Sequence, residues 1–184
     1  MKSAALAFFL TWTTYGTRLH GDERGTVDRR NNAFGTPRLR PNPRMLAFER
    51  SEVSGEVLLD EDRRRVVHEA IVRHAAHRGW DLLALAVRSN HVHVVIRNHD
   101  AEPERIMTEF KAWCTRSLRE CRGAHGDQRM WTRHGSTRHL FASENVHAAI
   151  HYVDERQDDR RRFDVERARR EFFERLKEER VRVE

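Results

Sequence analysis

Two histidines stand at the head of an apolar run in the stretch Ser89-Asn90-His91-Val92-His93-Val94-Val95-Ile96. If the run forms a β-strand, successive side chains alternate between the two faces of a sheet. His91 and His93 then project from one face, and the aliphatic residues that alternate with them face a core. Two imidazoles at that separation, roughly 7 Å along the strand, can share one metal ion. The stretch therefore predicts a strand with one core face and one candidate metal-binding face.

The residues around this strand predict an alternating order of strands and helices. Residues 81–88 form an apolar strand, and Ser89-Asn90 is short enough to join it to the histidine strand as a hairpin. Asp60 and Gly79 are suitable caps for a helix over 60–78. Further strands are expected at 4–15 and 130–141, and further helices at 100–122 and 143–157. This order predicts an α+β protein with a ferredoxin-like, split βαβ (RRM-like) antiparallel sheet and helices on one face.

The chain is long enough for one domain, expected at residues 1–158, followed by a charged C-terminal helix at 159–184. Residues 16–58 hold Pro37, Pro41 and Pro43 and predict a long basic loop. Its arginines Arg38 and Arg40 are candidate nucleic-acid contacts. A solvated insertion without a binding role is the alternative.

Composition narrows the class of partner. The chain of 184 residues has a formal net charge of +6 and a pI of about 10.1. Because the guanidinium group pairs with phosphate in a bidentate manner, an arginine-rich chain favours a nucleic-acid partner, although arginine can also act only as a solubilising cation. Cys114 and Cys121 lie about two turns apart on a predicted helix, too far for a disulfide, which favours a reducing cytoplasm. No stretch is long enough to span a membrane.

The predicted helix 143–157 carries Tyr152, one of only two tyrosines in the chain. Tyrosine can act as a covalent nucleophile, and a divalent ion held by two imidazoles and one oxygen ligand would polarise a phosphodiester. The pattern favours a chemistry of cutting and rejoining strands, with a half-buried structural tyrosine as the alternative. His147 and His151 are four residues apart on the same helix and could pair on a metal, but they also fit a solvated helix face.

A His-hydrophobe-His strand followed by one helical tyrosine resembles the HUH endonucleases. The closest resemblance is to the single-tyrosine transposases of small bacterial insertion sequences and their domesticated REP-associated relatives. It spans about residues 8–157 and is carried by the motifs Thr11-Trp12-Thr13-Thr14-Tyr15-Gly16-Thr17, Gly21-Asp22-Glu23-Arg24-Gly25, Ser89-Asn90-His91-Val92-His93, Met107-Thr108-Glu109-Phe110-Lys111, Trp131-Thr132-Arg133-His134-Gly135-Ser136-Thr137 and Tyr152-Val153.

The resemblance implies a mechanism and a substrate. His91 and His93 would bind Mg²⁺ or Mn²⁺. Tyr152 would form a 5′-phosphotyrosine on single-stranded DNA and release a 3′-OH. The implied substrate is the hairpin-forming end of a mobile element. Because many relatives act as homodimers, a second copy of the chain is a candidate partner.

The third metal ligand is the point at which this chain departs from its relatives. They often place Gln or Asn four residues after the tyrosine, where this chain has Arg156, and a guanidinium cannot bind a cation. Gln157 keeps the residue type but would face the metal only if the helix carries a π-bulge. Glu155 lies on the correct face of a regular α-helix. Both residues remain candidates, and loss of the ligand through decay is a third option.

The remaining expectations concern DNA contacts and rival functions. The predicted DNA-binding residues are Lys111, Arg133, Arg38 and Arg40. Trp131 is a candidate for stacking on bases, whereas Trp12 and Trp113 are expected in the core. One rival function is a non-catalytic or domesticated nucleic-acid-binding protein on the same fold. The other is a metal-dependent phosphodiesterase that uses water in place of Tyr152.

Overall fold

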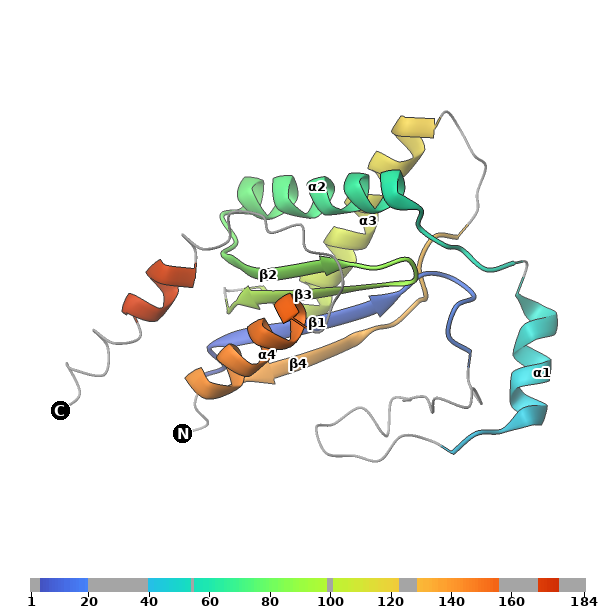
Figure 1. Cartoon of the computed structure of the whole chain (residues 1–184), viewed down its shortest axis with the longest axis horizontal. Helices are drawn as coiled ribbons and strands as arrows, with labels where there is room; N and C mark the ends of the chain where they lie inside the picture. Colours follow the sequence, from blue (N-terminus) through green and yellow to red (C-terminus); the bar gives the residue numbers. More distant parts are fainter. Residues whose placement is uncertain are drawn as a thin grey trace.

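A four-stranded antiparallel sheet forms the centre of the structure (Figure 1). The computed structural model describes residues 4–19, 40–53, 55–98, 101–122, 129–155 and 169–175. In the order in which they lie side by side, the strands are β2 (Leu82–Val87), β3 (His91–Arg97), β1 (Ala7–Thr13) and β4 (Ser136–Leu140). The β2–β3 hairpin and the position of β1 between β3 and β4 give the predicted ferredoxin-like arrangement.

The register of the sheet places a set of polar and aromatic side chains on one face. Thr11 of β1 pairs with His93 of β3, and Phe9 of β1 pairs with Arg138 of β4. Directly opposed residues share a face, as do residues two apart in one strand. The face that carries His91, His93, Thr11, Phe9 and Arg138 is called the histidine face below.

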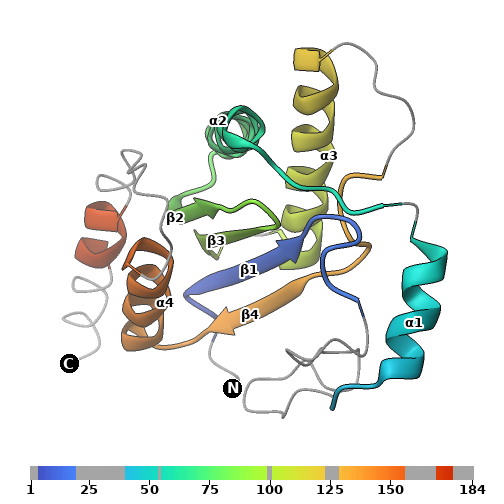
Figure 2. The same cartoon turned by 45° about the vertical axis from the view of Figure 1, so that its right-hand side comes forward.

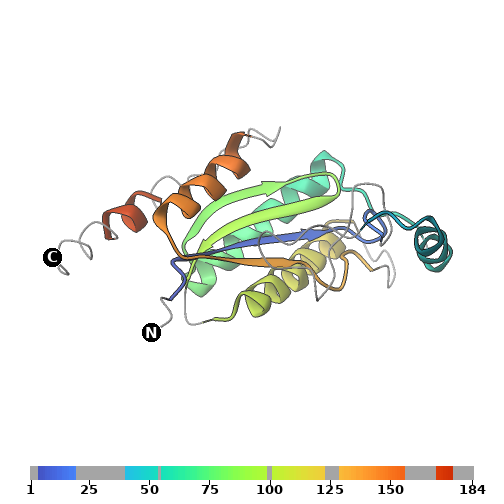
Figure 3. The same cartoon turned by 90° about the horizontal axis from the view of Figure 1, so that it is seen from below.

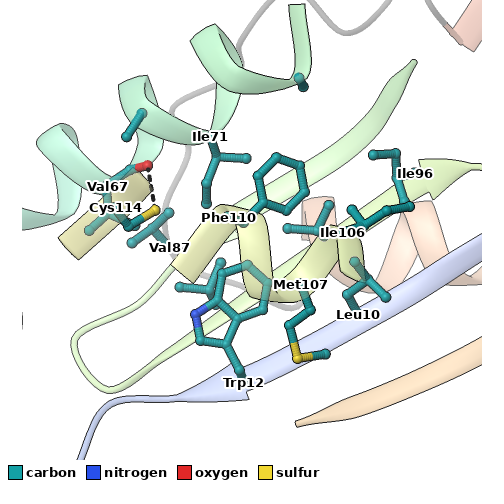
Figure 4. Packing of buried hydrophobic residues seen from close by; sticks show 14 of the residues in the cluster. Leu10, Trp12, Val67, Ile71, Val87, Ile96, Ile106, Met107, Phe110 and Cys114 are labelled. Atoms are coloured by element: carbon teal, nitrogen blue, oxygen red, sulfur yellow. Dashed lines mark hydrogen bonds between the residues drawn. The ribbon is translucent and has the colours of Figure 1, made fainter. Parts of the chain in front are cut away.

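The other face of the sheet is covered by α2 (Glu61–Arg78) and α3 (Pro103–Arg122). Trp12, Phe110 and Ile71 lie at the centre of this layer and are almost fully buried (Figure 4). The rings of Trp12 and Phe110 stack with their centroids 6.4 Å apart. These two helices share one face, as the ferredoxin-like pattern predicts, and they form the larger of the two cores.

Helix α2 has the boundaries that its capping residues predict. The Asp60 side chain accepts a hydrogen bond from the backbone N–H of Arg63 at a distance of 2.9 Å. At the other end, Gly79 adopts the left-handed conformation with φ 66°, which glycine reaches without a steric penalty. The predicted caps are therefore confirmed.

Helix α4 (Ser143–Glu155) packs on the histidine face, on the opposite side of the sheet from α3 (Figure 3). It buries Val146, Ile150 and Val153 against β2 and β3. Residues 169–175 are helical and extend this second core through Phe172, which is 3% exposed. Arg169 donates two hydrogen bonds to the Asp154 carboxylate, at 2.6 and 2.9 Å, and a further one to the carbonyl of Leu83.

The expectation of a continuous loop over 16–58 is wrong for its last part. Residues 43–52 form helix α1 (Pro43–Glu52), which stands beside the sheet and away from the other helices (Figure 2). Asn42 caps it by accepting a hydrogen bond from Met45 N. Proline is compatible with the first turn of a helix because the N–H that it lacks would have no helical partner there. Pro43 therefore begins a helix instead of excluding one. Residues 20–39 and 54 lie outside the described part of the chain.

Candidate functional site

The two histidines lie together on β3, as their spacing predicts. Their ring centroids are 4.7 Å apart, with the ring planes inclined at 73°. Between them Val92 points to the opposite face and is fully buried in the core. The apolar alternation of the strand therefore anchors the pair on a rigid element.

Each histidine has a polar neighbour at Nδ1. The Oδ1 atom of Asn90 accepts a hydrogen bond from Nδ1 of His91 over 2.7 Å, and the hydroxyl of Thr11 lies 2.8 Å from Nδ1 of His93. Because the Asn90 oxygen can only accept, Nδ1 of His91 carries the proton and Nε2 of His91 is the nitrogen that can donate an electron pair to a metal. The Thr11 hydroxyl can either donate to Nδ1 of His93 or accept from it, and Nε2 of His93 can bind a metal when the hydroxyl accepts. Partners of this kind orient metal-binding histidines and select their tautomer.

His93 is buried, with 6% of its surface exposed. Burial, with smaller contributions from the charges of His91 and Arg88, lowers the pKa of His93 to about 3. The imidazole is therefore neutral at physiological pH, which is the form that binds a metal.

Helix α4 places Tyr152 against this pair. The Tyr152 ring lies 5.6 Å from the His93 ring and 6.0 Å from the Phe9 ring, in edge-on contacts with both. The helix turns its buried side to β2 and β3 and leaves Tyr152 38% exposed at the border of the contact. The structure thus brings His91, His93 and Tyr152 together from distant parts of the sequence.

The third ligand is the least defined part of the site. The Glu155 carboxylate lies 2.8 Å from Nε2 of His151, and both side chains are well exposed. Within the described ranges, no group of three or more His, Cys, Asp or Glu side chains is placed to hold a metal ion, so Glu155 does not join the histidine pair. Gln157 lies outside the described residues, as does Arg156.

The alternative histidine pair on α4 is engaged elsewhere. Nδ1 of His147 lies 2.9 Å from the carbonyl oxygen of Ser143, and its ring stacks on Phe173 at 3.8 Å. His151 pairs with Glu155. Both histidines are exposed, in keeping with a solvated helix face.

The four predicted DNA-binding residues occupy different environments. Arg133 is exposed and directly follows Thr132. The hydroxyl of Thr132 lies 3.1 Å from that of Thr13, and Thr13 pairs with His91, so this segment lies near the His91 end of the site. Arg40 is exposed and lies three residues before the start of α1. Arg38 lies outside the described residues. Lys111 is partly buried, and its Nζ donates hydrogen bonds to the carbonyls of Thr132 and His134 over 3.0 and 3.2 Å.

The contacts of Lys111 hold the segment that leads into β4 against α3. Burial, with a contribution from the charge of Arg129, lowers the pKa of Lys111 from 10.5 to about 8. Between these two pH values the unfolded chain binds more protons than the folded chain. The free energy of unfolding therefore rises with pH through this window.

Replacing Lys111 with methionine removes both the hydrogen bonds of Nζ and the pH dependence that the lowered pKa causes. We expect Lys111→Met to lower the free energy of unfolding, because the carbonyls of Thr132 and His134 each lose a hydrogen bond from the ammonium, while that of His134 keeps its contact with the Thr132 hydroxyl. The difference from the wild type should be larger between about pH 8 and 10.5 than at neutral pH, since only the wild type gains stability there. Urea unfolding of both proteins, at neutral pH and at a pH inside that window, measures the two differences. Equal differences at the two pH values would contradict the expectation.

The tryptophans match the expectations in part. Trp12 is 1% exposed, as predicted. Trp113 is 40% exposed, contrary to its expected place in the core. Its ring stacks on that of His74, with the two centroids 5.2 Å apart, and so covers the edge of the core instead of entering it. Trp131 is buried and its indole N–H donates to the Thr115 hydroxyl over 3.0 Å, so it is a packing residue and not a platform for bases.

Sequence reasoning did not assign roles to Thr11, Asn90 and Phe9, although all three contact the site. Thr11 and Asn90 stand inside motifs that carry the resemblance to the single-tyrosine transposases, and Asn90 directly precedes His91. The alternation of side chains in β1 around the core residue Trp12 predicts which residues of the strand face the histidines. It places Phe9 and Thr11 on the face of the sheet opposite the larger core.

The family model described as IS200-like transposase matches residues 53–155, which is more than half of the chain. The chain therefore belongs to the IS200-like transposase family, whose members are DNA-processing enzymes of mobile elements. The Thr11–Thr17 motif lies upstream of the matched span.

The chain was also compared with solved structures and with curated proteins. Among solved structures, the chain is similar to a REP-associated tyrosine transposase bound to a REP hairpin, at 10% sequence identity and a TM-score of 0.43. The similarity covers 83% of this chain and 67% of that chain. No curated protein matches significantly. Among the helices of the described residues, none has the length and apolar character needed to cross a membrane.

Proposed function

We propose that this transposase cuts and rejoins single-stranded DNA at hairpin-bearing ends through a covalent Tyr152–phosphate intermediate. The observation that carries the proposal is the contact between the Tyr152 ring and the His93 ring. A tyrosine beside a pair of candidate metal ligands, in a chain of this family, has the groups that such a reaction needs.

The residues fit a divalent metal, for which Mg²⁺ or Mn²⁺ is proposed. His91 and His93 would hold it through Nε2, and Gln157 is the proposed third ligand. The Asn90 contact supports this assignment, since it holds the proton of His91 on Nδ1, and the Thr11 hydroxyl can accept from Nδ1 of His93 in the same way. When bound, the ion would polarise the phosphodiester and stabilise the charge that develops on it.

In the proposed reaction the Tyr152 oxygen attacks phosphorus while the bond from phosphorus to the 3′ oxygen breaks. The phenol proton passes to solvent, which the exposed position of Tyr152 permits, and the leaving 3′ oxygen takes up a proton. The downstream strand remains attached as a 5′-phosphotyrosine. Attack by a 3′-OH on that linkage restores the phosphodiester and the phenol. The bond energy is conserved, so rejoining needs no ATP.

A denaturing gel tests this proposal. Oligonucleotides that carry hairpins from the DNA flanking the gene are labelled at the 3′ end and incubated with the protein and Mn²⁺. The expected result is a labelled band that migrates with the protein and disappears after protease treatment, whereas a 5′ label should appear on a shorter free strand. Multiple turnover without an adduct would favour a phosphodiesterase that uses water.

One observation favours the non-catalytic alternative. The position one helical turn after Tyr152 is Arg156, and the described residues provide no third carboxylate, histidine or cysteine ligand beside the pair. A decayed copy would bind single-stranded DNA without forming an adduct in the same gel.

The hydroxyl of Thr11 gives a specific prediction for the metal site. Thr11→Val keeps the side-chain shape but removes the partner of His93 Nδ1, and we expect Mn²⁺ affinity to fall about 10–100-fold. Isothermal titration calorimetry measures the affinity. Thr13→Val is the matched control, because the Thr13 hydroxyl contacts Thr132 instead. Equal affinities for the two variants would contradict the assignment.

A further inference from the structure

We propose that Arg138 of β4 binds a backbone phosphate of the DNA strand beside the phosphate that Tyr152 attacks. The inference rests on the proposed function, because it assigns a further substrate contact at the same site. It concerns a residue that none of the sequence motifs indicated.

The register of the sheet places Arg138 on the histidine face. Arg138 is paired with Phe9, and its guanidinium carbon lies 6.0 Å from the centre of the Phe9 ring. The same ring lies 6.0 Å from Tyr152 and 5.5 Å from His93. A single phenyl ring is thus contacted by the guanidinium group, the proposed nucleophile and a proposed metal ligand.

A second row of the sheet connects β4 to the histidines. Ser136, two residues before Arg138, pairs with Thr11, and Thr11 pairs with His93. Neighbouring strands are about 4.8 Å apart, so this row spans roughly 10 Å from the β4 backbone to that of β3. Hydroxyl groups and an arginine therefore lie on one side of the histidines. Helix α4 lies on the other side, because it packs mainly on β2 and β3.

The chemistry of the guanidinium group suits the DNA backbone. It carries a permanent positive charge, and its planar N–H groups can bind two phosphate oxygens at once. Its position over the Phe9 ring restricts the orientation of that plane, which reduces the ordering that binding would require. A contact of this type positions the strand and does not read its sequence.

The salt dependence of DNA binding separates this role from a structural one. Wild-type and Arg138→Gln side chains are compared in the Tyr152→Phe background without metal, with fluorescein-labelled oligothymidylate as the probe and anisotropy as the readout. Loss of one charge-assisted contact should weaken binding on the order of 10-fold. It should also reduce the slope of log K against log salt by about 0.7, the value for one phosphate on a single strand.

The control is Arg116→Gln. Arg116 also stacks on an aromatic ring, with its guanidinium carbon 5.3 Å from the Trp113 ring centre, but it lies on α3 across the sheet. Its replacement should leave the slope unchanged. Arg138→Lys keeps the positive charge and should retain the wild-type slope, which guards against an effect of Arg138→Gln on folding.

Two results would overturn the proposal: an unchanged slope in Arg138→Gln, or the same reduction in Arg116→Gln. Because the binding assay involves neither the Tyr152 hydroxyl nor a metal, it is independent of the adduct assay. A reduced slope without any adduct from the wild-type protein would support the Arg138 contact and reject the proposed chemistry. An adduct together with an unchanged slope would support the proposed chemistry and reject the Arg138 contact.

Discussion

Tyr152→Phe is expected to abolish the covalent protein–DNA adduct and to leave the binding of single-stranded DNA unchanged. The substitution removes only the attacking oxygen, and the phenylalanine ring can keep the contacts with His93 and Phe9. Removal of a nucleophile from a catalytic set costs several orders of magnitude in rate, so cleavage should fall by at least about 10³-fold. The denaturing gel measures cleavage, and fluorescence anisotropy measures binding.

The other tyrosine supplies a matched control. Tyr15 packs against the guanidinium of Arg129, which lies 5.4 Å from its ring centre, whereas the ring that contacts His93 is that of Tyr152. Tyr15→Phe should form the adduct at the wild-type rate. An adduct that persists in Tyr152→Phe would show that another group is the nucleophile.

The second large effect is expected at the histidine pair. His91→Ala removes a proposed ligand that is only partly buried, so the fold should persist while Mn²⁺ binding is lost. The decrease in affinity should exceed the roughly 10–100-fold expected from loss of a hydrogen-bond partner alone. Calorimetric titration gives the affinity directly. Thermal unfolding gives a second measure, because a metal that binds only the folded state raises the melting temperature of the wild type.

His139→Ala is the control for this prediction. His139 lies on β4 but points to the opposite face of the sheet, where its ring packs edge-on against Phe8 at 5.0 Å. Its replacement should leave Mn²⁺ affinity unchanged. If His91→Ala binds Mn²⁺ as the wild type does, the histidine pair is not the metal site.

Local signals were sufficient for much of the fold. The alternation in β3 predicted which face carries His91 and His93, because side-chain period in a strand is set by backbone geometry alone. Asp60 and Gly79 marked the ends of α2, because they act on the backbone groups next to them. The order of elements then limited the sheet to a ferredoxin-like arrangement.

Features that depend on long-range packing were not predictable. The proximity of Thr11 to His93 requires the register between β1 and β3, and a shift of one residue would place Trp12 on the histidine face. The ammonium of Lys111 was expected to meet DNA, and its contacts with Thr132 and His134 depend on how α3 crosses the segment before β4. The prolines of residues 16–58 predict a loop, but Pro43 lies in the first turn of α1, where a helix accepts proline.

The way in which α4 is anchored has a consequence for reaction kinetics. Val146, Ile150 and Val153 bury one side of this helix against β2 and β3 of the same chain, which holds the Tyr152 ring against His93. The proposed nucleophile and the proposed metal ligands thus belong to one polypeptide. Dilution does not separate them, and the rate of cleavage per molecule of protein is expected to be independent of protein concentration.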